Sequence, residues 1–197
     1  MKKRGWILIL LLLTGACAGT TQGNPQGPQG LSLTPKSFGG TLSLSQLVTG
    51  DFDGRTYRMR FEIDITPDRL AVVALSPLGV TLFTLVQEQD KPALVTRGQQ
   101  PIAFDPSHIL FDLHLTYWPR KALHAALSQL SLTLFESDDG SVRRVQDPNG
   151  KTVTEITYGP KAVTPRSIVI QHFDVPYRLR IRSRDVGPRK QGKGKPF

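Results

Sequence analysis

The sequence predicts a mainly β fold with a helical part (α+β): a curved antiparallel half-barrel of about ten strands closed by a helical lid. Apolar and polar residues alternate along many short segments separated by turn signals, which is typical of strands with one buried face. Between residues 105 and 130 this alternation gives way to helical spacing. Two short helices cover a curved sheet incompletely, so we expect an apolar cavity beneath them. The alternative is a fully packed α+β core.

The first half of the chain predicts five strands in meander order. The most regular covers residues 57–65, with apolar side chains on one face and charged ones on the other. Residues 42–49 precede it, and the turn at residues 51–54 predicts a hairpin between the two. Turns rich in Pro, Gly and Asp place the remaining strands of this half at residues 70–75, 80–87 and 93–97.

Two amphipathic helices are predicted next. Asp105 and Pro106 offer an N-cap and a proline at the first helical position, and apolar residues follow at helical spacing. A second helix is expected at residues 120–130, after Pro119. Both are too short to be stable alone and need a surface to lie on. Strands then resume at residues 130–136, 142–146, 151–158, 167–173 and 177–183.

The lining of the expected cavity follows from these periodicities. The sheet and the helices would each turn large apolar side chains inward, and Trp118 stands where the two helices join. For Trp118, a core aromatic residue at a helix corner is the alternative reading. The candidate lining residues are Tyr57, Met59, Phe61, Ile63, Phe83, Leu85, Ile109, Leu110, Leu113 and Trp118.

The N-terminus predicts a lipoprotein signal peptide at residues 1–16. Lys2, Lys3 and Arg4 precede an apolar run that is too short to cross a bilayer, and small residues stand directly before Cys17. Cys17 would become the acylated first residue of the mature chain, and two or more acyl chains anchor a protein firmly. Ala18 follows, where an Asp commonly signals inner-membrane retention, so we expect the periplasmic face of the outer membrane. The alternative is an ordinary signal peptide with a stray cysteine.

The rest of the chain predicts one domain with a polar segment at each end. Residues 17–30 hold the acylated cysteine and a flexible tether, residues 31–186 the half-barrel domain, and residues 187–197 a basic disordered tail. The formal net charge is +9. An exported chain would not normally meet nucleic acid, so anionic head groups are the expected counter-charge.

Alternating arginines near the C-terminus are candidates for contact with these head groups. They lie on one strand face and are Arg178, Arg180 and Arg182, continued by Arg184. The alternative is a solvated outer face that discourages pairing at a sheet edge.

The sequence offers no constellation for catalysis or metal binding. A Gly-x-Ser-x-Gly elbow is absent, and the four histidines lack ligand spacing. Ser107 beside His108 is better explained by helix capping. We therefore expect neither an enzyme nor a cofactor.

Four short motifs resemble the outer-membrane lipoprotein receptor LolB. They are Leu75-Ser76-Pro77-Leu78-Gly79, Tyr117-Trp118-Pro119, Thr154-Glu155-Ile156-Thr157-Tyr158 and Arg178-Leu179-Arg180-Ile181. Residues 31–186 as a whole resemble a family of uncharacterised Gram-negative lipoproteins, often encoded beside aryl-polyene and fatty-acid-like synthesis genes and thought to share the LolA/LolB fold. The resemblance implies that Leu78 matches the protruding leucine of LolB, which helps pass acyl chains into the bilayer. The alternative is an apolar turn residue.

Together these observations predict a non-enzymatic, monomeric outer-membrane lipoprotein that binds acyl chains or another long apolar ligand. Lipoprotein or lipid trafficking, or envelope assembly with aryl-polyene lipid, would be its setting. The expected partners are membrane lipid, an acyl chain or lipoprotein cargo, and a periplasmic carrier. A scaffold lipoprotein without a ligand is the alternative, and a lipid hydrolase or acyltransferase is a third reading.

Overall fold

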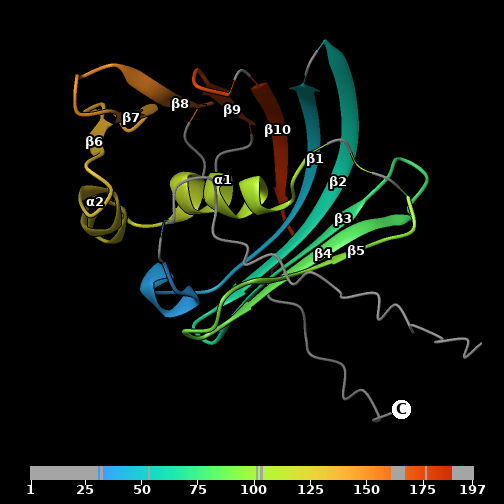
Figure 1. Ribbon diagram of the computed structural model, residues 1–197. Coiled ribbons are helices and arrows are strands. Elements are labelled where there is room, and N and C mark those ends of the chain that lie inside the picture. The colour runs from blue at the N-terminus through green and yellow to red at the C-terminus, as the bar shows by residue number, and fades with distance from the viewer. Residues whose placement is uncertain are drawn as a thin grey trace, which may run out of the picture.

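A computed structural model describes residues 31, 33–52, 54–100, 102, 104–160, 167–175 and 177–187. Within these residues one sheet of ten strands has the order β5-β4-β3-β2-β1-β10-β9-β8-β7-β6. Figure 1 shows the sheet curving around helix α1, with the two halves of the sheet on different sides of it. The predicted half-barrel with a helical part is confirmed.

The first half of the sheet is a meander that follows the predicted alternation. A short 3-10 helix, η1 (Pro35–Phe38), precedes it. All neighbouring pairs are antiparallel. The strands are β1 (Leu42–Phe52), β2 (Arg55–Thr66), β3 (Arg69–Leu75), β4 (Thr81–Glu88) and β5 (Leu94–Arg97).

Two helices and a second meander follow. Helix α1 covers Ser107–Tyr117 and α2 covers Arg120–Ser128. Asp105 precedes the N-cap of α1, which is Pro106 and not the predicted Asp105, and its Oδ1 accepts a hydrogen bond from the Ser107 amide at 3.0 Å. The remaining strands are β6 (Thr133–Glu136), β7 (Val142–Gln146), β8 (Thr152–Tyr158), β9 (Ser167–His172) and β10 (Tyr177–Asp185).

The pairing of β1 with β10 joins the two meanders into one sheet. It runs antiparallel over nine residue pairs, from Leu44 opposite Asp185 to Phe52 opposite Tyr177. Strand β10 therefore lies in the middle of the sheet, between β1 and β9. Its outward arginines are exposed, as a solvated outer face requires, but they do not protect a sheet edge, so that part of the alternative reading is wrong.

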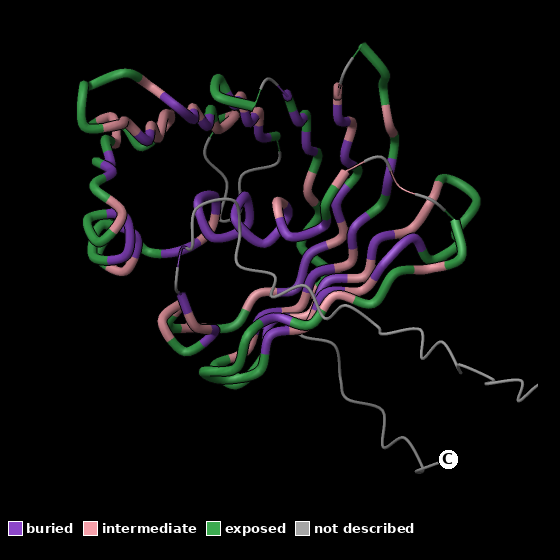
Figure 2. Tube along the Cα trace, in the orientation of Figure 1, coloured by how far each residue is buried: buried purple, intermediate pink, exposed green. Residues whose placement is uncertain are grey.

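The core lies on the concave side of the sheet and around α1 (Figure 2). Along β2 the buried positions alternate from Met59 to Ile65, as the sequence predicts. Helix α2 packs against β6 and buries Leu123 and Leu127, away from the middle of the trough. Of the two predicted helices, α1 crosses the trough and α2 lies to one side of it. Among the described residues, no helix has the length and apolar character needed to span a bilayer.

Candidate functional site

Helix α1 is the element that occupies the trough. Nine of its eleven residues are buried, from Ser107 through Thr116 with the exception of His108. A helix that is buried on all sides is a core helix and not an amphipathic surface helix. The sequence predicted a lid with one wet face, and the structure corrects this: α1 fills the space that a ligand in the trough would take.

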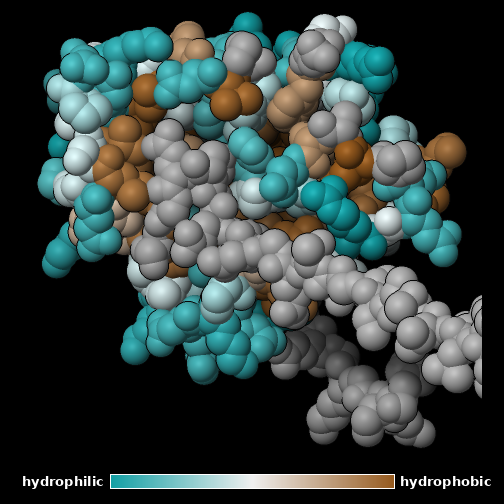
Figure 3. Space-filling view, in the orientation of Figure 1, coloured by the Kyte–Doolittle hydropathy of each residue, from teal (hydrophilic) through white to brown (hydrophobic). Residues whose placement is uncertain are grey.

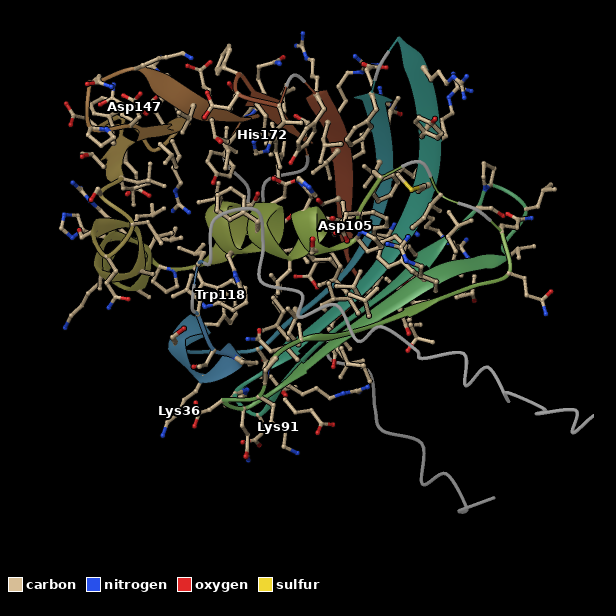
Figure 4. The ribbon with its side chains drawn as sticks, viewed as in Figure 1. Lys36, Lys91, Asp105, Trp118, Asp147 and His172 are labelled. Atoms are coloured by element: carbon tan, nitrogen blue, oxygen red, sulfur yellow. The ribbon has the colours of Figure 1, made fainter. Side chains whose placement is uncertain are left out.

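A buried polar cluster ties α1 to the sheet. Asp112 Oδ1 lies 2.7 Å from His172 Nε2, and the Tyr177 hydroxyl donates to both carboxylate oxygens of Asp112, at 3.1 and 3.2 Å. Thr154 Oγ1 lies 3.1 Å from His172 Nδ1. The rings of His172 and Tyr177 stack at 4.1 Å between centroids. Figure 4 shows His172 on the sheet directly above α1. We call Asp112, Thr154, His172 and Tyr177 the α1 clamp.

The α1 clamp contains a hydroxyl, an imidazole and a carboxylate in the order found in a catalytic triad. Thr154 is only 2% exposed, so solvent and substrate do not reach its hydroxyl in this conformation. Burial, together with the negative charge of Asp112, raises the pKa of Tyr177 well above its ordinary value, so this phenol stays a hydrogen-bond donor. The arrangement positions a helix and offers no accessible nucleophile.

The C-terminal half of α1 has further polar contacts. Tyr117 bonds to Gln46 of β1, and the Tyr158 hydroxyl donates to the carbonyl of Thr116 at 2.9 Å. Burial raises the pKa of Tyr158 to about 12. Arg143 donates to the carbonyls of Leu115 at 2.5 Å and of Trp118 at 3.2 Å, which satisfies acceptors that the end of a helix leaves free. Glu136 pairs with the same guanidinium.

Trp118 follows α1 and closes this end of the core. Its Nε1 donates to Ser37 Oγ at 2.9 Å, and its ring contacts Phe38 of η1 at 5.3 Å and His114 at 4.4 Å. Figure 4 shows Trp118 between α1 and η1. Burial lowers the pKa of His114 to about 3, and its Nε2 has no hydrogen-bond partner within the described part of the chain.

The predicted lining residues lie on the concave side of the sheet and on α1, with the exception of Trp118, which packs against η1. All are buried apart from Tyr57, which is half-buried. The structure brings Phe61, Ile109 and Leu113 together around one cavity beneath α1. That cavity measures about 10 Å³, room for about one water molecule. An acyl chain would therefore enter here only if α1 moved. Whether the ten residues line a ligand site stays a prediction.

The turn between β3 and β4 presents Leu78. The amide of Gly79 donates to the carbonyl of Ser76 at 2.9 Å, and Gly79 has a φ of 81°. Pro77 thus starts a three-residue hairpin loop that needs a left-handed residue at its end, which glycine supplies. Leu78 is 91% exposed, so it is not folded back against its own sheet.

A second hollow lies on the outer face of β10, β1 and β2, with a volume of about 610 Å³. Leu47 is 62% exposed on this face, whereas Val48 and Met59 are buried on the other face of the sheet. Arginine side chains lie around Leu47 in this hollow. The residues whose side chains turn outward into it are Leu47, Thr49, Arg58, Arg60, Arg180 and Arg182. We call it the outer cleft. Arg178 lies one row beyond, opposite Asp51.

Of the residues predicted to contact head groups, Arg180 and Arg182 lie in the outer cleft, and their role stays a prediction, as does that of Leu78. The α1 clamp and the central position of Leu47 were not predicted from the sequence. Asp112 is an acidic residue inside an apolar helical pattern, and that was the available signal. The predicted signal peptide, Cys17 and the tether, at residues 1–30, and all of the predicted tail at 187–197 except Gly187 lie outside the described residues. Within the described residues, no group of His, Cys, Asp and Glu is arranged to hold a metal ion. Figure 3 shows hydrophobic residues in separate patches, one of them at the margin of the face, and hydrophilic residues over most of the remaining coloured surface.

Residues 43–185, more than half of the chain, match the model of a family described as "Protein of unknown function (DUF3261)". The chain belongs to the DUF3261 family. This agrees with the resemblance to an uncharacterised family predicted from the sequence. A comparison with curated proteins finds no match.

Similar solved structures include a LolA superfamily protein from Nitrosomonas europaea, with 9% identity, a TM-score of 0.45, and coverage of 78% of this chain and 92% of that one. A DUF1329 family protein from Desulfovibrio piger has 11% identity, a TM-score of 0.48, and coverage of 75% and 87%. A putative outer membrane lipoprotein-sorting protein domain from Vibrio parahaemolyticus has 8% identity, a TM-score of 0.43, and coverage of 77% and 88%.

Proposed function

We propose that this DUF3261 protein is a lipoprotein, anchored through Cys17 at the periplasmic face of the outer membrane, that holds an acyl chain or a similar apolar ligand in its trough. The ligand would lie where α1 now lies, against the inward side chains of β2, β9 and β10. Leu78, on its exposed turn, would hand the ligand to the bilayer. In this proposal the protein traffics lipids or lipoproteins and performs no chemistry on them.

The observation that carries the proposal is the way α1 is held. An apolar helix fills a curved, apolar sheet, and a few side-chain hydrogen bonds rather than backbone pairing fix it there. A helix attached in this way can leave the trough without breaking the sheet, since the ladder from β5 to β6 is independent of it. An acyl chain would then cover the apolar sheet that α1 leaves, which offsets the sheet's part of the cost of opening.

The closed conformation also favours one alternative. With only about 10 Å³ free beneath α1, the domain could serve as a scaffold lipoprotein that never opens. In that case α1 is a permanent part of the core. The two functions differ in whether apolar ligands reach the trough, and tryptophan fluorescence can detect such a ligand.

The fluorescence of Trp118 reports ligand binding, because the other tryptophan, Trp6, belongs to the predicted signal peptide and is absent from the mature chain. We expect a brominated fatty acid to quench Trp118 fluorescence in the mature chain, while the unbrominated acid competes with it. Asp112→Asn weakens the α1 clamp, so quenching should occur at a lower concentration of the probe. Asp90→Asn, an exposed change on the turn between β4 and β5, is the control and should leave the titration unchanged.

The proposal fails if the brominated acid leaves Trp118 fluorescence unchanged in both the parent chain and Asp112→Asn. Mass spectrometry of the protein gently extracted from its own envelope gives a second, independent readout. Co-purified lipid or acylated peptide supports the carrier. Its absence, together with an unquenched tryptophan, leaves the scaffold alternative.

A further inference from the structure

The outer cleft has no place in the carrying of a ligand beneath α1, since it lies on the opposite face of the sheet. The strand register defines its arrangement. Leu47 pairs with Arg182 on one side and Arg60 on the other, and Thr49 pairs with Arg180 and Arg58 in the same way. Four arginines therefore stand around one leucine, with the members of each row about 10 Å apart across β1.

The positive charge of the outer cleft is only partly compensated. Arg180 Nη1 lies 2.8 Å from Asp51 Oδ2, and Arg60 Nε lies 3.3 Å from Glu62 Oε1. Arg58 and Arg182 form no ion pair with any residue in the described ranges. Like-charged guanidinium groups so close together are unfavourable without anions between them, so the cleft favours a ligand that brings negative charge.

Exposed apolar side chains accompany this charge. Leu47 lies between the arginines, and Ser76 and Pro77 line the same cleft, so the turn that carries Leu78 stands at its rim. Val80 on that turn is also exposed. Basic residues surrounding exposed apolar ones are the pattern of a surface that lies in the head-group region of a membrane.

We propose that the outer cleft and the Leu78 turn form one docking surface for an anionic membrane, with arginines on the phosphate head groups and Leu47 and Leu78 in the acyl boundary. The inference rests on the proposed membrane location. Residues 17–30 reach at most about 50 Å from an acylated Cys17 to Leu31, which keeps the domain within that distance of the bilayer. Docking would fix the orientation of the trough relative to the bilayer, whereas the tether alone would leave that orientation free.

The test removes the anchor. The mature chain with Cys17→Ser is sedimented with vesicles of phosphatidylethanolamine, with and without phosphatidylglycerol. We expect binding that requires phosphatidylglycerol and falls as salt is raised. A surface arginine contributes about fivefold to binding near an anionic membrane. Arg58→Gln with Arg182→Gln should therefore weaken partitioning about thirtyfold.

The matched control makes the same charge change elsewhere. Lys91→Gln with Lys121→Gln, both exposed, should alter partitioning less than about threefold, because these lysines lie on the β4–β5 turn and on α2. Leu78→Glu should weaken binding because a carboxylate enters the acyl region at high cost. Circular dichroism of each variant reports folding separately from binding.

Three results would overturn the inference. One is equal binding to vesicles that lack phosphatidylglycerol. A second is equal loss in the arginine and lysine double variants, which would mean that total charge alone attracts the chain. A third is tight binding of soluble polyphosphate without vesicle binding, which would assign the cleft to a free anion. Quenching of Trp118 by the brominated acid should not depend on these arginines, so failure here is distinct from failure of the ligand proposal.

Discussion

At the scale of single residues, the polar groups inside the core carry most of the information about mechanism. Asp112 and His114 are both buried on α1, but they differ in their hydrogen-bond partners. Asp112 has three hydrogen bonds, whereas His114 Nε2 has no partner in the described residues. The first fixes α1 to the sheet, and the second costs free energy when it becomes charged.

His114 should make the stability depend on pH. Its pKa is about 3 in the folded state and about 6.5 in the unfolded chain, so between these values the unfolded chain binds one more proton. The free energy of unfolding should fall as pH drops below 6.5, by up to about 1.4 kcal/mol per pH unit. Urea unfolding of the parent and His114→Phe at several pH values measures this contribution.

The parent and His114→Phe share all their carboxylates, so the difference between their unfolding free energies removes the contribution of carboxylate titration. The difference in unfolding free energy between His114→Phe and the parent should grow as pH falls from 6.5. A difference that stays constant down to about pH 4 would contradict burial of a neutral His114.

At the scale of elements, the strands were predictable and the role of α1 was not. Apolar and polar residues alternate along a strand, as at Met59 and Phe61, and turn residues such as Pro77-Leu78-Gly79 mark its end. Both signals are local in the sequence. The burial of α1 depends on partners far away in the chain, since His172 stands 60 residues beyond Asp112. Helical spacing indicates which face is apolar but does not say whether the other face is covered. A four-residue helix such as η1 has no periodicity to detect.

Arg143 should matter more for stability than its neighbour Arg144. Arg143 is mostly buried, caps the end of α1 and pairs with Glu136. Arg144 is more exposed and pairs with Glu155 on the outer face. Arg143→Met should lower the free energy of unfolding by about 3 kcal/mol. Arg144→Met, a matched change one residue away, should cost about 1 kcal/mol or less.

Thermal and urea unfolding, followed by circular dichroism, would measure both variants. Equal losses would mean that the contacts of Arg143 with the carbonyls of Leu115 and Trp118 add nothing to the α1 end. A lower concentration of brominated acid for half-maximal quenching of Trp118 is also expected in Arg143→Met, because α1 is held less firmly there.

At the scale of the whole molecule, the two faces of the sheet offer two different surfaces. The concave face is apolar and holds α1, and the outer face of β10, β1 and β2 carries the arginines around Leu47. No local signal predicts this division, because β10 lies beside β1 only through a pairing between the two ends of the domain. Periodicity showed that Arg180 and Arg182 share a face. It did not show that Arg58 and Arg60 join them.

Anchoring and docking are separable at this scale, and Cys17→Ala separates them in cells. Without an acylated cysteine the chain should leave the membrane fraction of a Gram-negative host and appear in the soluble periplasm once high salt has weakened head-group contacts. Ala18→Asp keeps the cysteine and should instead move the protein to the inner membrane, so it controls for expression and folding. Membrane retention of Cys17→Ala at high salt would contradict lipid anchoring. Retention at low salt alone would point to the outer cleft.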